Sequence, residues 1–407
     1  MGNTLYDGEK LIAGNPSEEY RLLALFRYWN IIQYFFPYKD VMDQDWSQVL
    51  EEFIPKVMAP EGWSEAYHLA IREMTARIND SHSFTYSSSL GGFWGYYYPP
   101  FKARWIEEKT VVVKTFPALL QGANLQVGDI ITHVDGKSID VLRQERRKYV
   151  EASNEARLQY NLCNYLFQSN FREIVLRLDR GSSQAEVKVP TCALSEVNNE
   201  ETRSLPSMAY SILPGNIGYV HMALLQSSDV ANAMNLLQNT RAIIFDIRNY
   251  PNFILYLLSE HLNPRQTDFA CFKIPNLDYP GQFYFTPNSK AGPAAENAGY
   301  YKGRVVILVN EVTISRAEFT VMALETAPAA TVIGSQTAGA DGNVSSVTLP
   351  GNITTSFSGI GVFYPDRRPT QRIGIVPDIV VRPTVAGIRA GRDEELERAL
   401  EFIETGK

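Results

Sequence analysis

The stretch RVVILVNEVTISRAEFTVMALETAPAATVIG, residues 304–334, decides the fold class. An apolar run typical of a buried strand is followed by a helical pattern and then by a second short apolar run. Strands that alternate with helices predict parallel pairing through helical crossovers. The same alternation occupies the segments 216–225, 228–238, 242–247 and 253–262. We therefore predict an α/β core in the C-terminal half of the chain.

Ser315 stands where the first apolar run passes into the helix. Parallel sheets bind their ligands beyond the carboxyl ends of the strands, so this serine occupies a position suited to chemistry. It is also followed three residues later by Glu318, which is the capping-box pattern of a helix start. The two interpretations are compatible, because both need a helix N-terminus. A serine hydroxyl becomes a good nucleophile only when a neighbouring base takes its proton.

Composition excludes several classes of protein. The chain has 407 residues, which is too many for one ordinary core, so we expect two or three domains. A formal net charge of −7 argues against a nucleic-acid partner. No apolar run approaches the roughly 20 residues that span a bilayer. Three widely spaced cysteines, Cys163, Cys192 and Cys271, indicate neither a disulfide framework nor a zinc site.

The sequence divides into four segments. Residues 1–92 carry helical periodicity and end in the polar loop NDSHSFTYSSSLGG, which contains Ser81 and His82. Residues 93–192 change to short strands, and LQVGDIITHVDGKSI within them resembles a PDZ domain, with an Asp135-Gly136 hairpin turn. Such domains bind extended peptides by strand addition; a purely structural β domain is the alternative. Residues 193–207 are polar and are interpreted as a linker, and residues 208–407 form the α/β core.

Three further motifs give the core a family resemblance. VILVNEVTISRAEF, VIGSQTAGADG and RIGIVPDIVV resemble the core of the C-terminal processing (tail-specific) serine peptidases, and the PDZ-like segment precedes them in that family's order. The resemblance implies a crotonase-like spiral ββα fold. In one branch of the family a lysine about 25 residues after the serine is the general base. Here Ala340 stands at that position, and no lysine occurs between Lys302 and Lys407. A local Ser-Lys dyad is therefore excluded.

The other branch resembles tricorn protease, in which a Ser-His dipeptide upstream of the PDZ segment supplies the base. Ser81 and His82 match that dipeptide. The other four histidines lie within or near predicted helices and strands, where structural or solvent-facing roles are ordinary: His68, His133, His221 and His261. His82 lies among small polar residues, which leaves an imidazole free to turn toward a partner. The resemblance thus implies His82 as base and Ser81 as a residue that orients it.

The residue that holds the imidazole departs from the family pattern. The family's acid lies three residues before the first glycine of a GIxPD motif, and here that position is Gln371. A glutamine oxygen can accept the Nδ1–H bond and orient the ring, but it brings no full negative charge. Asp366 and Asp378 are possible substitutes, and Asp378 suits a local turn or cap better. We expect Gln371 to take the orienting role.

The expected oxyanion hole also departs from the family. Ser315 at a helix start would place the Arg316 N–H near the developing charge. The second donor of the family follows a DLRxNxGG-like strand, which here reads FDIRNYPNF and lacks the glycine pair. A proline has no N–H, so Asn252 is the remaining donor. Asp246 and Arg248 are expected to form a structural ion pair.

These observations predict a serine endopeptidase that cleaves peptides or protein tails and needs no metal or cofactor. Its partner is a peptide or unfolded protein, captured or gated by the PDZ-like segment, and its oligomeric state is left open. One alternative is a non-catalytic peptide-binding protein, favoured by Gln371, Ala340 and the lost glycine pair. The other is a small acyl hydrolase, since this scaffold hosts several acyl chemistries. The N-terminus MGNTLYDGEK shows no secretory signal, yet the resemblance implies an extracytoplasmic protein whose signal sequence is missing from this chain.

Overall fold

The computed structural model describes residues 16–59 and 65–407, and these form two compact units. Unit 1 contains the N-terminal half up to Leu205 together with two later segments, Val344–Phe357 and Thr384–Arg392. Unit 2 contains Pro206–Asn343, Ser358–Pro383 and Asp393–Lys407. The N-terminal residues on which the signal-sequence interpretation depends lie outside the described part of the chain.

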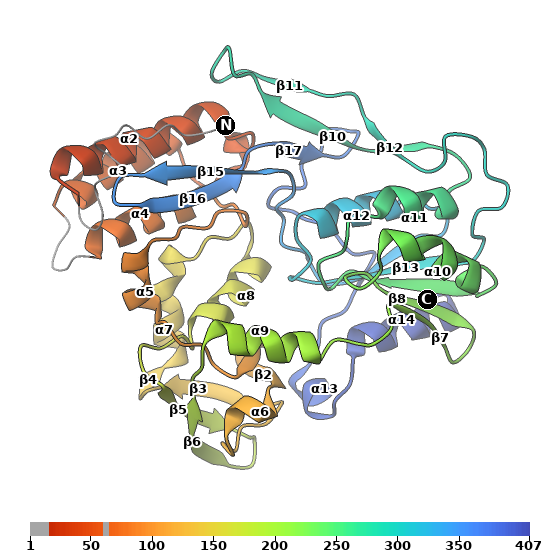
Figure 1. Ribbon diagram of the computed structural model, residues 1–407, viewed down its shortest axis with the longest axis horizontal. Coiled ribbons are helices and arrows are strands. Elements are labelled where there is room, and N and C mark those ends of the chain that lie inside the picture. The colour runs from red at the N-terminus through yellow and green to blue at the C-terminus, as the bar shows by residue number, and fades with distance from the viewer. Residues whose placement is uncertain (1–15, 60–64) are drawn as a thin grey trace. The chain divides into compact units, whose positions relative to one another are not determined.

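The main sheet of unit 2 is built from parallel strands (Figure 1). Its order is β18-β14-β13-β9-β8-β7, and β7 at the edge runs antiparallel to β8. Every residue of β9 is buried, as expected of a parallel strand covered on both faces. The strands are β7 (Tyr210–Leu213), β8 (Ile217–His221), β9 (Ala242–Asp246), β13 (Arg304–Val309), β14 (Ala330–Gly334) and β18 (Ile379–Val380).

Alternating side chains of these strands pack against helices on opposite faces. Ile243 and Phe245 of β9 belong to the core beneath α10, α11 and α12, whereas Ile244 packs with Ile403 of α14 on the other face. Figure 1 shows the three helices on one side of the sheet and α14 on the other. The helices are α10 (Val230–Leu237), α11 (Leu255–Leu262), α12 (Arg316–Leu324) and α14 (Glu394–Thr405), with a short 3-10 turn, η3, at Ser227–Asp229.

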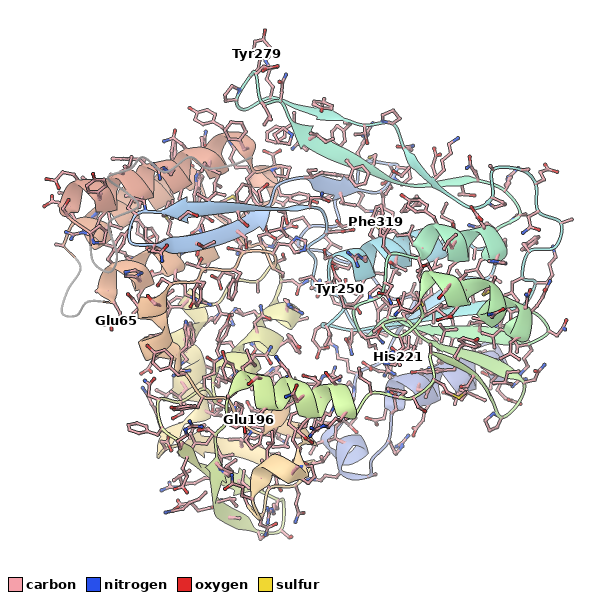
Figure 2. The ribbon with its side chains drawn as sticks, viewed as in Figure 1. Glu65, Glu196, His221, Tyr250, Tyr279 and Phe319 are labelled. Carbon is pink, nitrogen blue, oxygen red and sulfur yellow. The ribbon has the colours of Figure 1, made fainter. Side chains whose placement is uncertain are left out.

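A second, smaller sheet of unit 2 has antiparallel strands. β10 pairs with β11, β12 and β17, so that Cys271 lies opposite Phe363 from a segment some ninety residues later. The tip of the β10–β11 arm carries exposed apolar side chains, among them Tyr279 (Figure 2). The strands are β10 (Thr267–Pro275), β11 (Phe283–Phe285), β12 (Ser289–Ala291) and β17 (Gly361–Phe363).

Unit 1 begins with a group of helices. Tyr28 of α2 contacts Trp46 of α3 edge to face, with ring centroids 6.2 Å apart, and both side chains are buried. Asp45 caps α3 by accepting the Ser47 N–H at 2.9 Å. The elements are α2 (Glu18–Phe35), η1 (Lys39–Val41), α3 (Trp46–Met58), α4 (Ala66–Ala76) and α5 (Ser88–Trp94).

An antiparallel sheet of order β1-β2-β3-β5-β6 follows in unit 1, with β4 paired to β3. Its core includes Phe101, Ile131 and Leu176, and α8 lies against the edge strand β1. The strands are β1 (Phe101–Ile106), β2 (Lys109–Thr115), β3 (Ile130–Val134), β4 (Lys137–Ser138), β5 (Glu173–Asp179) and β6 (Gln184–Pro190). The helices are α6 (Pro117–Leu120), α7 (Ile139–Arg146), η2 (Arg147–Tyr149), α8 (Glu155–Tyr165) and α9 (Leu194–Arg203).

Two late segments of the chain complete unit 1. The hairpin of β15 (Val344–Leu349) and β16 (Ile353–Ser358) pairs Thr354 with Tyr86, and Phe357 contacts Phe36. The short helix α13 (Val385–Arg389) places Val385 among the apolar side chains of β1 to β3. Neither association has a local sequence signal, because the partners lie more than two hundred residues apart.

The α/β class expected from the sequence is confirmed. The spiral core, the PDZ-like assignment and the bounds of the four sequence segments stay predictions. Residues 193–207, interpreted as a linker, contain the helix α9. In the part of the chain that is described, no helix is both long enough and apolar enough to cross a membrane.

Candidate active site

The turn between β13 and α12 positions Ser315 in unit 2. Asn310, next after the strand, accepts the Val312 N–H at 3.0 Å with its side chain and so starts the turn. Thr313 donates its hydroxyl to the carbonyl of Ile247 at 2.8 Å, which ties the turn to the end of the adjacent strand β9. Ser315 then serves as the N-cap residue of α12. The serine thus stands at the carboxyl edge of the parallel sheet, as predicted.

Ser315 has a backbone conformation that residues with a side chain rarely adopt. Its φ is 59° and its ψ is −126°. Such a conformation costs about 1–3 kcal/mol and persists only where the surrounding structure imposes it. Glu318 accepts the Ser315 N–H, which is the backbone half of the predicted capping box.

Glu318 holds the backbone around Ser315. Its carboxylate is fully buried and accepts the N–H of Ser315 at 3.2 Å, that of Gly339 at 2.8 Å and that of Ala340 at 3.1 Å. The hydroxyl of Thr337 donates to the same carboxylate. Burial nevertheless raises the pKa of Glu318 to about 7, although these hydrogen bonds oppose the rise. The predicted capping partner is thus also a clamp between the nucleophile turn and the loop 337–340.

The position that would carry a lysine is filled by a buried alanine. Ala340 accepts the Ser315 N–H at 2.9 Å through its carbonyl. The neighbouring Asp341 is also buried, and burial together with the charge of Glu318 raises its pKa well above the ordinary value. The surroundings of Ser315 in unit 2 thus contain two buried carboxyl groups.

Gln371 reaches the same loop from the C-terminal side. The N–H of Arg372 donates to the carbonyl of Gly339 at 2.8 Å, and the Gln371 side chain is buried. Gly374 has a φ of 68°, and a Cβ there would lie 2.3 Å from the Thr337 hydroxyl oxygen. Only glycine fits that approach without displacement. Ser315 and Arg372, the residue after Gln371, thus bond to adjacent residues of one loop.

The two alternatives to Gln371 bond elsewhere. Asp366 is exposed and accepts the Arg368 N–H at 3.0 Å in a surface turn. Asp378 accepts the Val332 N–H of β14 at 2.8 Å, a structural contact with a distant strand and not the local turn or cap expected for it.

The two expected oxyanion donors, Arg316 and Asn252, belong to loops that contact each other through the Arg316 side chain. Arg316 is the first residue of α12, where helix geometry leaves its N–H without an intrahelical acceptor. Its guanidinium donates to the Pro251 carbonyl at 3.5 Å, so the loop that carries Asn252 lies beside it. The Asn252 side chain donates to the Leu225 carbonyl at 2.9 Å, which anchors that loop. Whether these two N–H groups bind an oxyanion stays a prediction.

Asp246 and Arg248 form the structural ion pair expected from the sequence. The Nη2 of Arg248 lies 2.7 Å from Asp246, and its Nη1 lies 2.7 Å from both Asp393 and Glu395 of the C-terminal helix region. The hydrogen bonds from Arg248 hold the pKa of Asp246 below its ordinary value despite burial. This network joins β9 to α14 and stabilises the core.

The Ser81-His82 loop belongs to unit 1, and its backbone is held on both sides. The His82 N–H donates to the carboxylate of Asp80 at 3.0 Å, and its carbonyl accepts the Ser356 hydroxyl of β16 at 2.8 Å. Burial lowers the pKa of His82 below its ordinary value, the charge of Asp80 opposes this, and that of Arg157 adds to it. The lowered pKa favours the neutral imidazole, the form that a general base needs.

Ser81 is tied to the sheet-and-helix part of unit 1. Its N–H donates to the Ser153 hydroxyl and its own hydroxyl accepts the Ser153 N–H, both at 2.8 Å. Ser153 directly precedes Asn154, the N-cap of α8. The orienting role expected for Ser81 stays a prediction, because the hydrogen bonds described for it hold the loop rather than the imidazole.

Sequence reasoning missed Asp80. This carboxylate is fully buried two residues before His82, and its charge raises the histidine pKa, which means that it stabilises the imidazolium. The sequence DSH places this aspartate two residues before His82, but the family pattern directs attention to Gln371 as the position of the acid. Of the other histidines, His68 is buried and its Nδ1 lies 2.8 Å from the Ser87 hydroxyl, a structural role.

Residues 216–381, which contain the nucleophile turn and the Gln371 loop, match the model of peptidase family S41. The chain carries an S41 peptidase domain. The expected family is thereby confirmed, and with it the class of serine-type peptidase. The sites named above stay predictions, as does the distance between His82 of unit 1 and Ser315 of unit 2.

Solved structures support the same fold beyond the S41 segment. Mature CPAF complexed with lactacystin is 15% identical, with a TM-score of 0.74 and coverage of 96% of this chain and 99% of that one. A protein from Parabacteroides merdae ATCC 43184 is 16% identical, with a TM-score of 0.58 and coverage of 96% of this chain and 97% of that one. At such identities the likeness shows the fold alone. Among curated proteins, none matches the chain significantly.

Proposed function

We propose that this S41 peptidase cleaves peptides or unfolded protein tails with Ser315 as nucleophile and His82 as general base. The observation that carries the proposal is the strained backbone of Ser315 at the start of α12, directly after the β13 turn. Strain of this kind clusters at functional sites, where the fold stabilises a geometry that the chain alone avoids.

In the proposed reaction Ser315 Oγ attacks the scissile carbonyl carbon while its proton passes to the His82 imidazole. The N–H groups of Arg316 and Asn252 stabilise the oxyanion. The imidazolium then gives the proton to the leaving amine, and a water molecule releases the acyl group by the same steps in reverse order. The neutral state of His82, favoured by its burial, suits it to the first transfer.

The charge that Gln371 cannot supply is assigned to Asp80. Gln371 orients the imidazole as an acceptor, and the buried carboxylate of Asp80 offsets the positive charge formed during catalysis. The amide of Gln371 thus orients the imidazole and the carboxylate of Asp80 supplies the negative charge, two roles that a single acid has in the family. The compartment is proposed to be extracytoplasmic, on the resemblance alone.

A fluorophosphonate probe tests the assignment. Wild type should be labelled at Ser315, and labelling should vanish in Ser315→Ala and fall by at least about a hundredfold in rate in His82→Ala, since general-base catalysis contributes 10²–10⁴-fold. His68→Ala serves as the matched control and should label normally if the protein folds. An unlabelled wild type that still binds peptides would support the non-catalytic alternative. Rapid cleavage of simple esters without peptide cleavage would support the acyl hydrolase.

A further inference from the structure

The residue next to the nucleophile is a positively charged arginine held by exposed aromatic rings. The guanidinium carbon of Arg316 lies 5.3 Å from the ring centroid of Tyr250 and 5.8 Å from that of Phe253. Both rings come from the loop between β9 and α11, and Figure 2 labels Tyr250 there. The exposed fraction is 50% for Tyr250 and 60% for Phe253. These three side chains are called the Arg316 cluster below.

Arg316 is oriented without being neutralised. Its Nη1 donates to the Pro251 carbonyl, a neutral acceptor, at 3.5 Å. Among the described residues it takes part in no ion pair with a carboxylate, whereas Arg248, on the loop that follows β9, contacts three. A guanidinium has five N–H donors in a planar fork, so one weak hydrogen bond leaves most of its donors for a ligand.

The aromatic rings give the cluster a second chemical character. Phe253 contacts Tyr256 edge to face at 5.8 Å, and Tyr256 in turn contacts the buried Phe269 at 6.2 Å. The exposed ring of Phe253 is therefore supported from the core and does not need the arginine to hold it in place. A rigid apolar face beside a guanidinium fits a carboxylate flanked by an apolar side chain.

We propose that the Arg316 cluster is a substrate subsite of the S41 domain that binds a peptide carboxylate next to the scissile bond. The carboxylate can come from an acidic side chain or from the free C-terminus of the substrate. The chain carries a net charge of −7, so a carboxylate ligand needs a local cation, and Arg316 provides one adjacent to Ser315. This proposal rests on the proposed function, because it presupposes that Ser315 is the nucleophile.

The proposal is tested with a pool of synthetic peptides of known sequence, digested by the full chain and read by mass spectrometry. Cleavage sites should be enriched in Asp or Glu near the cut, or should lie close to free C-termini. In the best substrate, Glu→Gln and C-terminal amidation are then compared separately, which distinguishes the two sources of carboxylate. We expect kcat/KM to fall about fivefold for the change that removes the bound carboxylate, the scale of a partly exposed charge pair.

The variants Arg316→Lys and Arg316→Glu give the decisive comparison. The lysine variant should retain the preference for carboxylate over amide, and the glutamate variant should remove or reverse it. Phe253→Ala should reduce the preference for an apolar residue beside the carboxylate. Arg304→Gln is the matched control, since Arg304 begins β13 at the opposite end of the strand from Ser315 and packs on Phe402.

The outcomes separate the subsite from the mechanism. If the fluorophosphonate labels Ser315 and peptides are cleaved but Arg316→Glu changes acidic and neutral substrates equally, the subsite is wrong and the nucleophile stands. If wild type is not labelled, the proposed function itself fails. Melting temperatures of all variants show whether a loss reflects misfolding, and the carboxylate-to-amide ratio within one variant is insensitive to the fraction folded.

Discussion

The buried carboxyl of Glu318 makes the stability of unit 2 depend on pH in a defined direction. Its pKa is raised by burial from 4.5 to about 7. A carboxyl whose pKa is raised on folding binds more protons in the folded state, so the free energy of unfolding falls as the pH rises between the two pKa values. Integration from pH 5 to pH 8 gives a loss of about 2.5 kcal/mol from this one group.

Glu318→Gln isolates that contribution. The variant cannot titrate at this position, so the stability difference between wild type and variant should change by about 2.5 kcal/mol across that pH range, in favour of wild type at pH 5. For a unit of roughly 200 residues this corresponds to about 5–10 °C in melting temperature. In the variant an amide NH₂ replaces one of the two carboxylate oxygens and cannot accept a hydrogen bond. At least one buried N–H therefore loses its acceptor, which costs about 1–3 kcal/mol of stability at every pH.

The measurement is thermal unfolding of wild type and Glu318→Gln at pH 5, 6, 7 and 8 in one ionic strength. Glu325, whose pKa burial also raises to about 7, titrates in both proteins and cancels in the difference. If the melting temperatures of the two proteins change with pH in parallel, Glu318 keeps an ordinary pKa in the folded state. If wild type gains relative stability as the pH rises, the hydrogen bonds from Ser315, Gly339 and Ala340 outweigh burial, and the reasoning is refuted.

Three further predictions concern the proposed mechanism. Asp80→Asn should lower the pKa of His82 further, so the acidic limb of the plot of kcat/KM against pH should move to lower pH. If the limb does not move, the charge of Asp80 does not affect the imidazole. Gln371→Glu should raise that pKa and move the limb upward, with kcat at high pH unchanged or increased; a tenfold lower kcat there would contradict the orienting role. Ser153→Ala should remove the hydroxyl that accepts the half-buried Ser81 N–H, destabilising unit 1 by about 1 kcal/mol and lowering kcat, with recovery in Ser153→Thr; loss of stability with unchanged kcat would make the pair purely structural.

The parallel core could be predicted because its signal is local. Strands such as β9 and β13 are covered on both faces and therefore read as continuous apolar runs between helical patterns. The ion pair of Asp246 and Arg248 was accessible for the same reason, since both residues follow one buried strand. The position of Ser315 at the carboxyl edge of the sheet followed from its place in the sequence, between a predicted strand and a predicted helix.

The features that sequence reasoning missed depend on distant partners. β10 pairs with β17, and the hairpin of β15 and β16 joins unit 1 through the pairing of Thr354 with Tyr86. Because the partners lie far apart in the sequence, no local apolar pattern predicts either pairing. The helix α9 buries Val197 while most of its side chains are polar, which made 193–207 resemble a linker. Asp80 was missed because the acid was expected at the family position of Gln371, although Asp80 lies only two residues before His82 and accepts its N–H.

The exchange of lysine for alanine at position 340 is consistent with the carboxyl groups that surround it. A lysine acts as a general base only when it is neutral, which requires a pKa lowered by desolvation or by nearby cations. Ala340 lies next to Glu318 and Asp341, both buried, and a lysine there would form an ion pair with either carboxyl group, which would raise the pKa of the lysine. With alanine the Ser315 N–H bonds the Ala340 carbonyl and the Glu318 carboxylate, and the loop serves to hold the nucleophile's backbone. In the lysine branch one loop both positions the serine and carries the base that accepts its proton. In this chain the loop only positions Ser315, and the proposed base, His82, comes from another part of the chain.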